Sequence, residues 1–514
     1  MQIYTNLLKE FKNYLGNELK DQPTRNFENV FYINKSRVRD IAFFFGEKSV
    51  NLKNILINDF KNKYEVIYEY FNEYIPDNQY LFVFTEVDKD SNEIDSVRVA
   101  YPQVESYEDE ISKRYGIKFL YFKEELEEIL PNLPIKLFPA HSAKNILSQG
   151  VFNRIHLTDN YFHFNLDKNI IKSVNFKTGW LYRGIIPLLK YKNWGKENLQ
   201  LIEKICSTSS FHHSLAYSLA MESIINVSVS NRVKMIRTIY CEIERIINHI
   251  FWFVNLMYLT YNFKEYHNLL NKVLDFLSFL EKELGTRYFE ELNYIGYVKD
   301  ISWHSLEDLR EAIEEIDSSL FEILHNRIYN SNLKKRFKDL GTLIEENVPE
   351  SGIIGPNIRA AGQIYDVRYF SPYNSYLDED IIGKWEVVTF NGGDAYSRIQ
   401  VRLWELKNSV SIIKGAIDYL KNNTEKIEVI DLANIKLYAD EIGISVVEAP
   451  QGELVYILKT SDRPGKDNLG SVSIQTPSMN NFFALKNFIL PNCDLKDFPL
   501  IVHSMDLCFN CIDL

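Results

Sequence analysis

The sequence predicts an α+β protein, with a small N-terminal α/β domain followed by a mainly α-helical domain that carries peripheral β-structure. Residues 1–128 mix helical periods with strand-like runs. Residues 198–340 instead have apolar side chains at helical spacing almost throughout. Strand-like runs return near the end of the chain, at 446–458 and 470–477.

The elements are expected in the following order. An amphipathic helix occupies residues 1–15, and strands follow at 80–87 and 97–102. Within 198–340, long helical runs are predicted to bundle, because each presents an apolar stripe to its neighbours. A further long helix is expected at about 394–420, after a region punctuated by glycine and proline.

Prolines predict the boundary between the two domains. Three of them fall within ten residues of the stretch 130–143, and proline both ends helices and stiffens connections. We therefore assign residues 1–128 to the first domain, 129–143 to a linker and 134–514 to the second domain, whose start near Pro134 overlaps the linker.

Composition excludes several classes of protein. The 514 residues are 46 % hydrophobic, which is enough for two or three cores. A formal charge of -12 leaves no basic surplus for nucleic acid. The most apolar run, at 236–261, is interrupted by charged residues, so it predicts a buried helix and not a membrane span. The N-terminus lacks the features of a signal peptide, so we expect a cytoplasmic protein.

Cysteine usage points to redox or metal chemistry. Five cysteines in a chain of this length exclude a disulfide scaffold. Cys508 and Cys511 form a close pair, and in a reducing compartment such a pair is typical of a redox or metal site.

Several motifs of the second domain follow one another in a specific order. They are EKICSTSSFHHSLAYSLAME (203–222), GIIGPNIRAAGQIYDVRYFSPYNSY (352–376), GGDAYSRIQVRLWELKNS (392–409), EAPQGELVYIL (448–458), IQTPSMNNFFAL (474–485) and HSMDLCFNC (503–511). Together they resemble the large subunit of group 4, energy-converting NiFe hydrogenases and the related 49 kDa subunit of respiratory complex I. The resemblance implies a hydrogenase-large-subunit-like fold from about Pro134 to the last residue.

The first domain carries a motif of its own, VESYEDEISKRYGIKF at 104–119. It is similar to the signature of the 30 kDa subunit of complex I and of its hydrogenase counterpart. The presence of both parts in one chain resembles the large subunit of formate hydrogenlyase-type hydrogenases. The resemblance therefore implies a 30 kDa subunit-like accessory domain at 1–128.

In that family, nickel is bound by four cysteine thiolates from two CxxC pairs, and two of the thiolates bridge to iron. The resemblance implies Cys206, Cys508 and Cys511 as metal ligands and places Ser209 where a bridging thiolate should be. A serine hydroxyl is hard and weakly acidic, so it replaces a thiolate poorly. We expect a Ni-Fe site with an incomplete ligand set; the alternative is that the three thiols pack in the core without metal.

Further candidates follow from the same resemblance. Ile186 stands where the family has a proton-transferring glutamate, and it cannot accept a proton, so we do not expect rapid hydrogen turnover. Arg183, Arg359 and Asp366 match charged residues of the family's cavity and are candidate catalytic residues; the alternative is a buried ion-pair network. His213 falls on a family histidine, and we interpret it as a core residue.

The resemblance implies a large-subunit-type component of a membrane-associated hydrogenase or complex I-like oxidoreductase complex. Iron-sulfur clusters are expected only in partner subunits, because a cluster typically takes four cysteines. The expected partners are an iron-sulfur small subunit and membrane-arm subunits. The chain itself should lie in the cytoplasm, peripheral on the inner face of the cell membrane.

Two alternatives stay open. The first is the quinone module of an NADH- or ferredoxin-quinone oxidoreductase; the family's quinone tyrosine would fall at Ser207, and its histidine loop is reduced to FPAHSAK at 138–144. The second is a metal-free paralogue with a structural or coupling role, which Ser209 and Ile186 favour and the intact Cys508 and Cys511 oppose.

Overall fold

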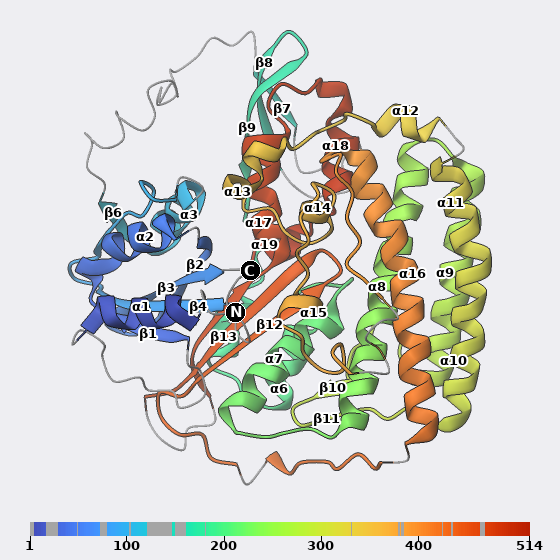
Figure 1. Ribbon diagram of the computed structural model, residues 1–514, viewed down its shortest axis with the longest axis horizontal. Helices are drawn as coiled ribbons and strands as arrows, with labels where there is room; N and C mark the ends of the chain where they lie inside the picture. The colour runs from blue at the N-terminus through green and yellow to red at the C-terminus, as the bar shows by residue number, and fades with distance from the viewer. Residues whose placement is uncertain are drawn as a thin grey trace.

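The computed structural model of the chain describes residues 5–16, 29–48, 50–71, 80–101, 104–120, 146–149, 161–179, 181–329, 332–378, 381, 385–423, 425–432, 435–462 and 468–514. Long helices and small sheets make up this part of the chain, which confirms the predicted mixture of helix and sheet (Figure 1). Of the helices described, none combines the length and the apolar character needed to cross a bilayer.

The described part of residues 5–120, here called the N-terminal unit, is built on a four-stranded sheet. The strand order is β1 (Val30–Ile33), β4 (Tyr80–Asp88), β3 (Lys63–Phe71) and β2 (Asn51–Asp59), with β1 and β4 parallel and the other pairs antiparallel. One face shares a core with α1 (Thr5–Leu15), α2 (Val38–Glu47) and α3 (Glu105–Tyr115). Because side chains alternate along a strand, the other face is available to the rest of the chain.

Long helices form the opposite side of the molecule (Figure 1). They are α8 (Asn231–Leu259), α9 (Phe263–Leu284), α10 (Trp303–Glu315), α11 (Phe321–Tyr329) and α16 (Ala395–Asn422), while α7 (Ser210–Ile224) lies nearer the middle of the molecule. Ser230 caps α8 and Asp394 caps α16 through their side-chain oxygens, which satisfy amides that a helix start leaves unpaired. The predicted helical stretch is interrupted by a small hairpin, β10 (Asn293–Tyr294) and β11 (Tyr297–Val298).

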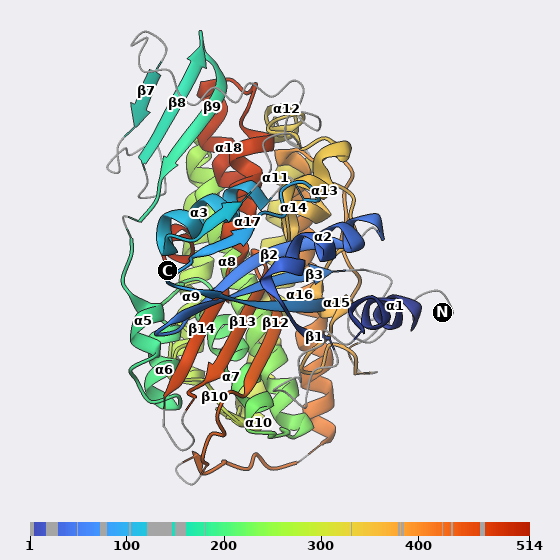
Figure 2. The ribbon, with the colours of Figure 1, turned by 90° about the vertical axis from the view of Figure 1, so that its left-hand side faces the viewer.

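A three-stranded antiparallel sheet separates the helices from the N-terminal unit (Figure 2). It consists of β12 (Ile442–Ala449), β13 (Gly452–Thr460) and β14 (Leu469–Gln475). Helix α7 packs on β12 so closely that a Cβ at Gly443 would lie 2.1 Å from the Ala220 carbonyl oxygen. On the other side, β14 lies beside β2 of the N-terminal unit.

The other described elements are shorter. They are β5 (Glu93–Asp95), β6 (Lys118–Leu120), the sheet β7 (Ile146–Gln149), β8 (Tyr161–Asp167) and β9 (Ile170–Lys177), and the helices α5 (Ile185–Leu189), α6 (Lys196–Ile202), α12 (Leu333–Phe337), α13 (Val348–Ser351), α14 (Pro356–Arg359), α15 (Val367–Phe370), α17 (Pro477–Ala484), α18 (Phe498–Met505) and α19 (Phe509–Ile512).

The strand expected at 97–102 was wrong. Residues 97–101 form turns, in which the amides of Ala100 and Tyr101 both donate to the Val97 carbonyl oxygen. The buried carboxylate of Glu108 accepts from the Val97 amide at 3.0 Å, so a side chain of α3 replaces a strand partner. The predicted linker at 129–143 lies outside the described residues, so the division into domains stays a prediction.

Buried polar contacts join the N-terminal unit to the central sheet. The Ser473 hydroxyl of β14 donates to the Ile57 carbonyl at 2.9 Å and to the Asn58 side chain at 2.6 Å. Asn58 in turn donates to Glu65 at 2.8 Å, and the Lys459 ammonium pairs with the same carboxylate at 3.1 Å. The two parts are therefore held by directional bonds as well as by apolar packing.

Glu69 at this interface predicts a pH-dependent stability. Its side chain is fully buried, and one oxygen accepts from Asn54 at 2.6 Å. Burial and the negative charge of Glu453 raise the pKa of Glu69 well above its ordinary value of 4.5. The folded chain thus holds this proton more tightly than the unfolded chain. The stability so gained is complete below pH 4.5 and is lost as the pH rises through the raised pKa.

A Glu69→Gln variant removes this titration and keeps an acceptor for Asn54. We expect the unfolding temperature of the variant, relative to that of the unaltered protein, to increase as the pH is raised from 4 to 8. Circular dichroism measures both midpoints. A Glu47→Gln variant at an exposed site of α2 serves as the control and should follow the unaltered protein. Parallel curves for Glu69→Gln and the unaltered protein would contradict the assignment.

Candidate functional site

The structure brings the three predicted metal-ligating cysteines together. Cys206 lies in the turns between α6 and α7, and Cys508 and Cys511 lie at the start and within α19. The three sulfurs are all within 4.8 Å of one another, and those of Cys206 and Cys508 are 3.6 Å apart. Cys206 and Cys511 are buried and Cys508 is half-buried. Two segments some 300 residues apart in sequence thus form one thiol cluster.

Arg183, a predicted catalytic residue, ties these two segments together. Its guanidinium donates to the carbonyl oxygens of Lys204 and Ile205, directly before Cys206. It also donates to the Asn510 carbonyl at 3.3 Å, within α19. A planar group with several donors suits such a bridge between backbones.

Hydroxyl side chains fix the second segment from the other side. The Cys508 amide donates to the Ser478 hydroxyl at 2.9 Å, and the Thr476 hydroxyl donates to the Cys511 carbonyl at 2.9 Å. Both hydroxyls belong to the start of α17, so this helix sets the position of both cysteines.

The three thiols share their protons. Hydrogen bonds from Cys508 and Cys511 hold the pKa of Cys206 well below that of an ordinary thiol. The charge of the Cys206 thiolate in turn raises the pKa values of Cys508 and Cys511. Cys206 is therefore the thiol of the cluster that loses its proton most readily, and a thiolate is the form that binds a soft cation or attacks an electrophile.

The Ser209 hydroxyl donates to a residue outside the thiol cluster. It donates to the side-chain oxygen of Gln451 at 3.0 Å, and both residues are buried. Gln451 lies in the tight turn between β12 and β13, here called the hairpin tip (residues 449–452). The predicted replacement for a thiolate is thus engaged by the hairpin tip.

His213 is a residue that sequence reasoning set aside. Its ring is buried, one nitrogen bonds the Tyr456 hydroxyl at 2.7 Å, and the other lies 3.9 Å from the Cys511 sulfur. Burial lowers the pKa of His213 to about 4, so the ring is neutral and can offer a lone pair at neutral pH. The sequence could have indicated a place for His213 in the site, because this histidine lies in the same segment as Cys206.

Arg359 and Asp366, the other predicted catalytic residues, lie in a buried ion network. The Arg359 guanidinium donates to Glu405 at 2.6 Å and to Glu448 at 2.8 Å, and it pairs with Asp366 at 3.3 Å. All four side chains are at most 1 % exposed. Their described contacts match the ion-pair alternative, and a catalytic role stays a prediction.

This network holds the hairpin tip. Glu448 precedes the tip, and its carboxylate also accepts from the Val367 amide at 3.2 Å. Arg245 of α8 donates to the backbone carbonyls of Glu448 at 2.6 Å and Ala449 at 3.1 Å. The buried charges therefore fix the turn that carries Gln451. This turn is connected to the segment of Cys206 through the bond from Ser209 to Gln451.

A cavity of about 290 Å³ lies beside Cys508. Its polar lining includes Ser207, Thr208, Asn248 and Gln451, while apolar side chains of α8 and α18 close the other side. No lysine or arginine is found among the described residues that line it. Asp506 and His503 also line it, so the cavity gives a small molecule other than an anion a route to the half-buried sulfur of Cys508.

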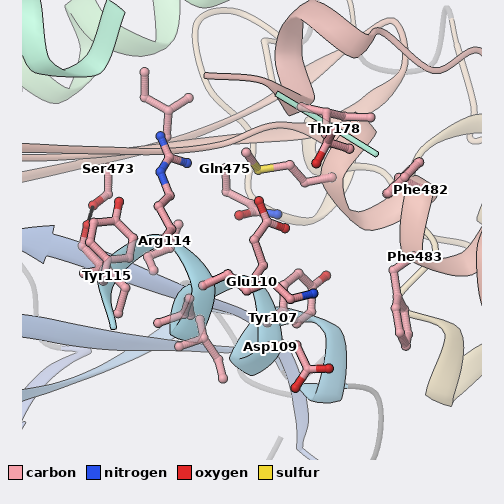
Figure 3. A pocket seen from close by; sticks show the side chains of 18 of the residues that line it. Tyr107, Asp109, Glu110, Arg114, Tyr115, Thr178, Ser473, Gln475, Phe482 and Phe483 are labelled. Carbon is pink, nitrogen blue, oxygen red and sulfur yellow. Dashed lines mark hydrogen bonds between the residues drawn. The ribbon is translucent and has the colours of Figure 1, made fainter. Parts of the chain in front are cut away.

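A second cavity, of about 230 Å³, lies between α3 and β14. Figure 3 shows Glu110 and Arg114 of α3 extending toward the side where Ser473 and Gln475 lie. Ile186 lines the same cavity. The isoleucine at the family's glutamate position thus faces a cavity that also contains the carboxylate of Glu110.

Comparison with known proteins agrees with the motifs. Residues 272–439 match the family described as respiratory-chain NADH dehydrogenase, 49 Kd subunit. The carbon monoxide-induced hydrogenase of Rhodospirillum rubrum is 28 % identical over 69 % of this chain and 94 % of its own length. The membrane-bound hydrogenase subunit alpha of Pyrococcus furiosus is 27 % identical over 68 % of this chain and 83 % of its own.

A complex I-type protein and a solved structure match as well. A subunit of the NADH-quinone oxidoreductase of Wolbachia pipientis wMel is 27 % identical over 68 % of this chain and 93 % of its own. A chain in the structure of the membrane-bound sulfane sulfur reductase, an archaeal respiratory membrane complex, superposes with a TM-score of 0.65. It is 25 % identical and covers 73 % of this chain and all of its own.

The chain is thus similar over about two thirds of its length to hydrogenase subunits and to a complex I-type subunit, and it shares the fold of the respiratory membrane complex chain. The family match at 272–439 covers helices and not the thiols, so the cysteines are assigned from the motifs and the geometry. A Ni-Fe pair of the kind the resemblance implies needs four thiolates, and three are gathered here. The donor set does not fit that pair.

Proposed function

We propose that this chain is the large-subunit component of a membrane-associated oxidoreductase complex of the hydrogenase and complex I family. The names of its relatives support this: two are hydrogenases, one is a subunit of an NADH-quinone oxidoreductase, and one belongs to a respiratory membrane complex. In this role the chain works with an iron-sulfur subunit and with membrane-arm subunits, on the inner face of the cell membrane.

The proposed centre of the chain is a single soft metal ion, nickel in the first place, bound by the thiolates of Cys206, Cys508 and Cys511. The distance between the sulfurs is the observation that supports this proposal. Two thiolates on one tetrahedral ion lie about 3.7 Å apart, and Cys206 and Cys508 are 3.6 Å apart. Such a centre lacks the second bridging thiolate and a glutamate at position 186, so we propose chemistry other than rapid hydrogen turnover.

A second candidate is thiol chemistry without metal, which the same 3.6 Å separation and the cavity beside Cys508 favour. The solved relative comes from a complex named a sulfane sulfur reductase. An organic disulfide would accept two electrons from the thiols of Cys206 and Cys508, giving two thiols as product and a Cys206–Cys508 disulfide. Two electrons and two protons delivered through the partner subunits would then regenerate both thiols.

Elemental analysis of the purified complex tests the metal centre. Nickel is the decisive element, because the iron of partner clusters would mask iron at this site. We expect close to one nickel per chain in the unaltered protein, and loss of most of it in a Cys508→Ala variant. A Cys493→Ala variant, which removes a half-buried thiol outside the cluster, should keep its nickel.

A Ser209→Cys variant sharpens the test by restoring a fourth thiolate. We expect it to hold at least as much nickel as the unaltered protein. Nickel absent from both proteins would overturn the metal centre. A Cys206–Cys508 disulfide found by peptide mass spectrometry after treatment with an organic disulfide would then support the second candidate.

A further inference from the structure

The hairpin tip is held from two sides. On one side Glu448 is bound by Arg359 of the buried ion network. On the other side, Glu453 follows the tip and pairs across the hairpin with Glu448. Its carboxylate accepts from the hydroxyl of Tyr80, which belongs to β4 of the N-terminal unit. A residue far from the thiols in sequence thus contacts β13, the strand that directly follows Gln451.

The contact at Glu453 is a closed, buried triad. The hydroxyls of Tyr80 and Tyr365 lie 2.5 Å apart, and both donate to the same carboxylate oxygen, Oε2 of Glu453. The three side chains are at most 6 % exposed. The second oxygen of Glu453 has no hydrogen-bond partner among the described residues. Glu453 therefore depends on these two phenols for its solvation.

Only one of these donors comes from the N-terminal unit. Tyr365 lies in the same part of the chain as Arg359, and its backbone carbonyl accepts from that guanidinium at 2.8 Å. Tyr80 instead reaches across from β4, and Phe71 of β3 packs on both tyrosine rings. Tyr80 is thus a polar link from the N-terminal unit to the strand that follows the hairpin tip.

We propose that Tyr80 is a positioning residue for the thiol site: through Glu453 it sets the hairpin tip, and through the Gln451–Ser209 bond it sets the segment that carries Cys206. This inference deepens the proposed function, on which it rests. It gives the N-terminal unit a role in the site without any contact between that unit and the sulfurs.

Loss of the Tyr80 hydroxyl should displace the tip. The carboxylate would keep one hydrogen-bond donor in a dry environment, so it turns toward another partner. This change moves β13 and its turn. The bond from Ser209 to Gln451 spans 3.0 Å, so a small displacement breaks it. The cavity beside Cys508, which Gln451 lines, then opens.

A Tyr80→Phe variant of the full-length chain tests this, with Tyr32→Phe as the matched control. Tyr32 lies on the same face of the sheet and is similarly buried, but its hydroxyl has no partner among the described residues. The protein is treated with iodoacetamide, and peptide mass spectrometry measures how far each cysteine is alkylated. The readout is the extent of alkylation of Cys508 divided by that of Cys493. Cys493 bonds the Ile489 carbonyl and serves as the internal reference.

We expect Tyr80→Phe to raise the ratio roughly tenfold, the change in an opening equilibrium when a hydrogen bond to a charged group is lost. Tyr32→Phe should leave it unchanged. Ser209→Ala removes the bond to Gln451 and should raise the ratio by a similar factor. The Tyr80→Phe/Ser209→Ala double variant should raise it no further than either single variant. A purely structural weakening by Tyr80→Phe would add to the Ser209→Ala effect.

The outcomes separate this inference from the proposed function. Additive effects in the double variant, or an unchanged ratio in a folded Tyr80→Phe protein, would overturn the positioning role. Nickel absent from the unaltered protein would overturn the metal centre alone, since the alkylation ratio needs no metal.

Discussion

An Arg359→Met variant is expected to lose about 3–5 kcal/mol of unfolding free energy, the cost of leaving buried charges unpaired. Methionine keeps the length of the side chain but removes every donor. Glu405 and Glu448 would then lose the cation that now binds them in a dry environment, while Asp366 would keep its pair with Arg368. The repulsion among these carboxylates makes the loss larger than that of any one bond.

Urea denaturation followed by circular dichroism measures the loss. Arg287→Met is the control, because Arg287 pairs with Glu281 where the two side chains are 40 % and 53 % exposed. Exposed pairs contribute about 0–1 kcal/mol, so this variant should unfold close to the unaltered protein. Equal shifts in the two variants would contradict the network described here and would return Arg359 to the candidate catalytic residues.

The local parts of this fold were predictable from the sequence. The region after the glycine- and proline-punctuated stretch predicted the long helix that the structure has at Ala395–Asn422, and a strand-like run predicted the strand at Tyr80–Asp88. The strand expected at 97–102 failed, because the carboxylate of Glu108 satisfies the Val97 amide in place of a neighbouring strand. A side chain that competes for backbone bonds leaves no periodic signal.

The site was predictable where motifs mark it and not where it depends on pairing between distant residues. Motif spacing led to Cys206, Cys508 and Cys511, which the structure places together; metal binding stays a prediction. The partners of Arg359 lie 46 and 89 residues away, and a sequence does not specify which carboxylates it will meet. His213 was interpreted as a core residue, and its distance to Cys511 depends on how α7 packs against α19.

The second large effect is expected where Gly355 packs on the hairpin tip, in a Gly355→Ala variant. A Cβ at Gly355 would lie 2.3 Å from the Gln451 carbonyl oxygen and 2.5 Å from the Cα of Gly452. The backbone of Gly355 has φ 67° and ψ −147°, a region that is essentially restricted to glycine. Strain and overpacking together should cost about 2–4 kcal/mol, measured by urea denaturation.

Gly46→Ala in α2 is the matched control, because a Cβ there meets nothing within 4 Å. Alanine favours helix over glycine, so this variant should gain up to about 1 kcal/mol. Gly355→Ala should also change the thiols before it unfolds the chain, since the clash falls on Gln451, the partner of Ser209. A folded Gly355→Ala protein could instead have an unchanged alkylation ratio of Cys508 to Cys493. That result would show that the thiol cluster keeps its geometry when the hairpin tip is displaced.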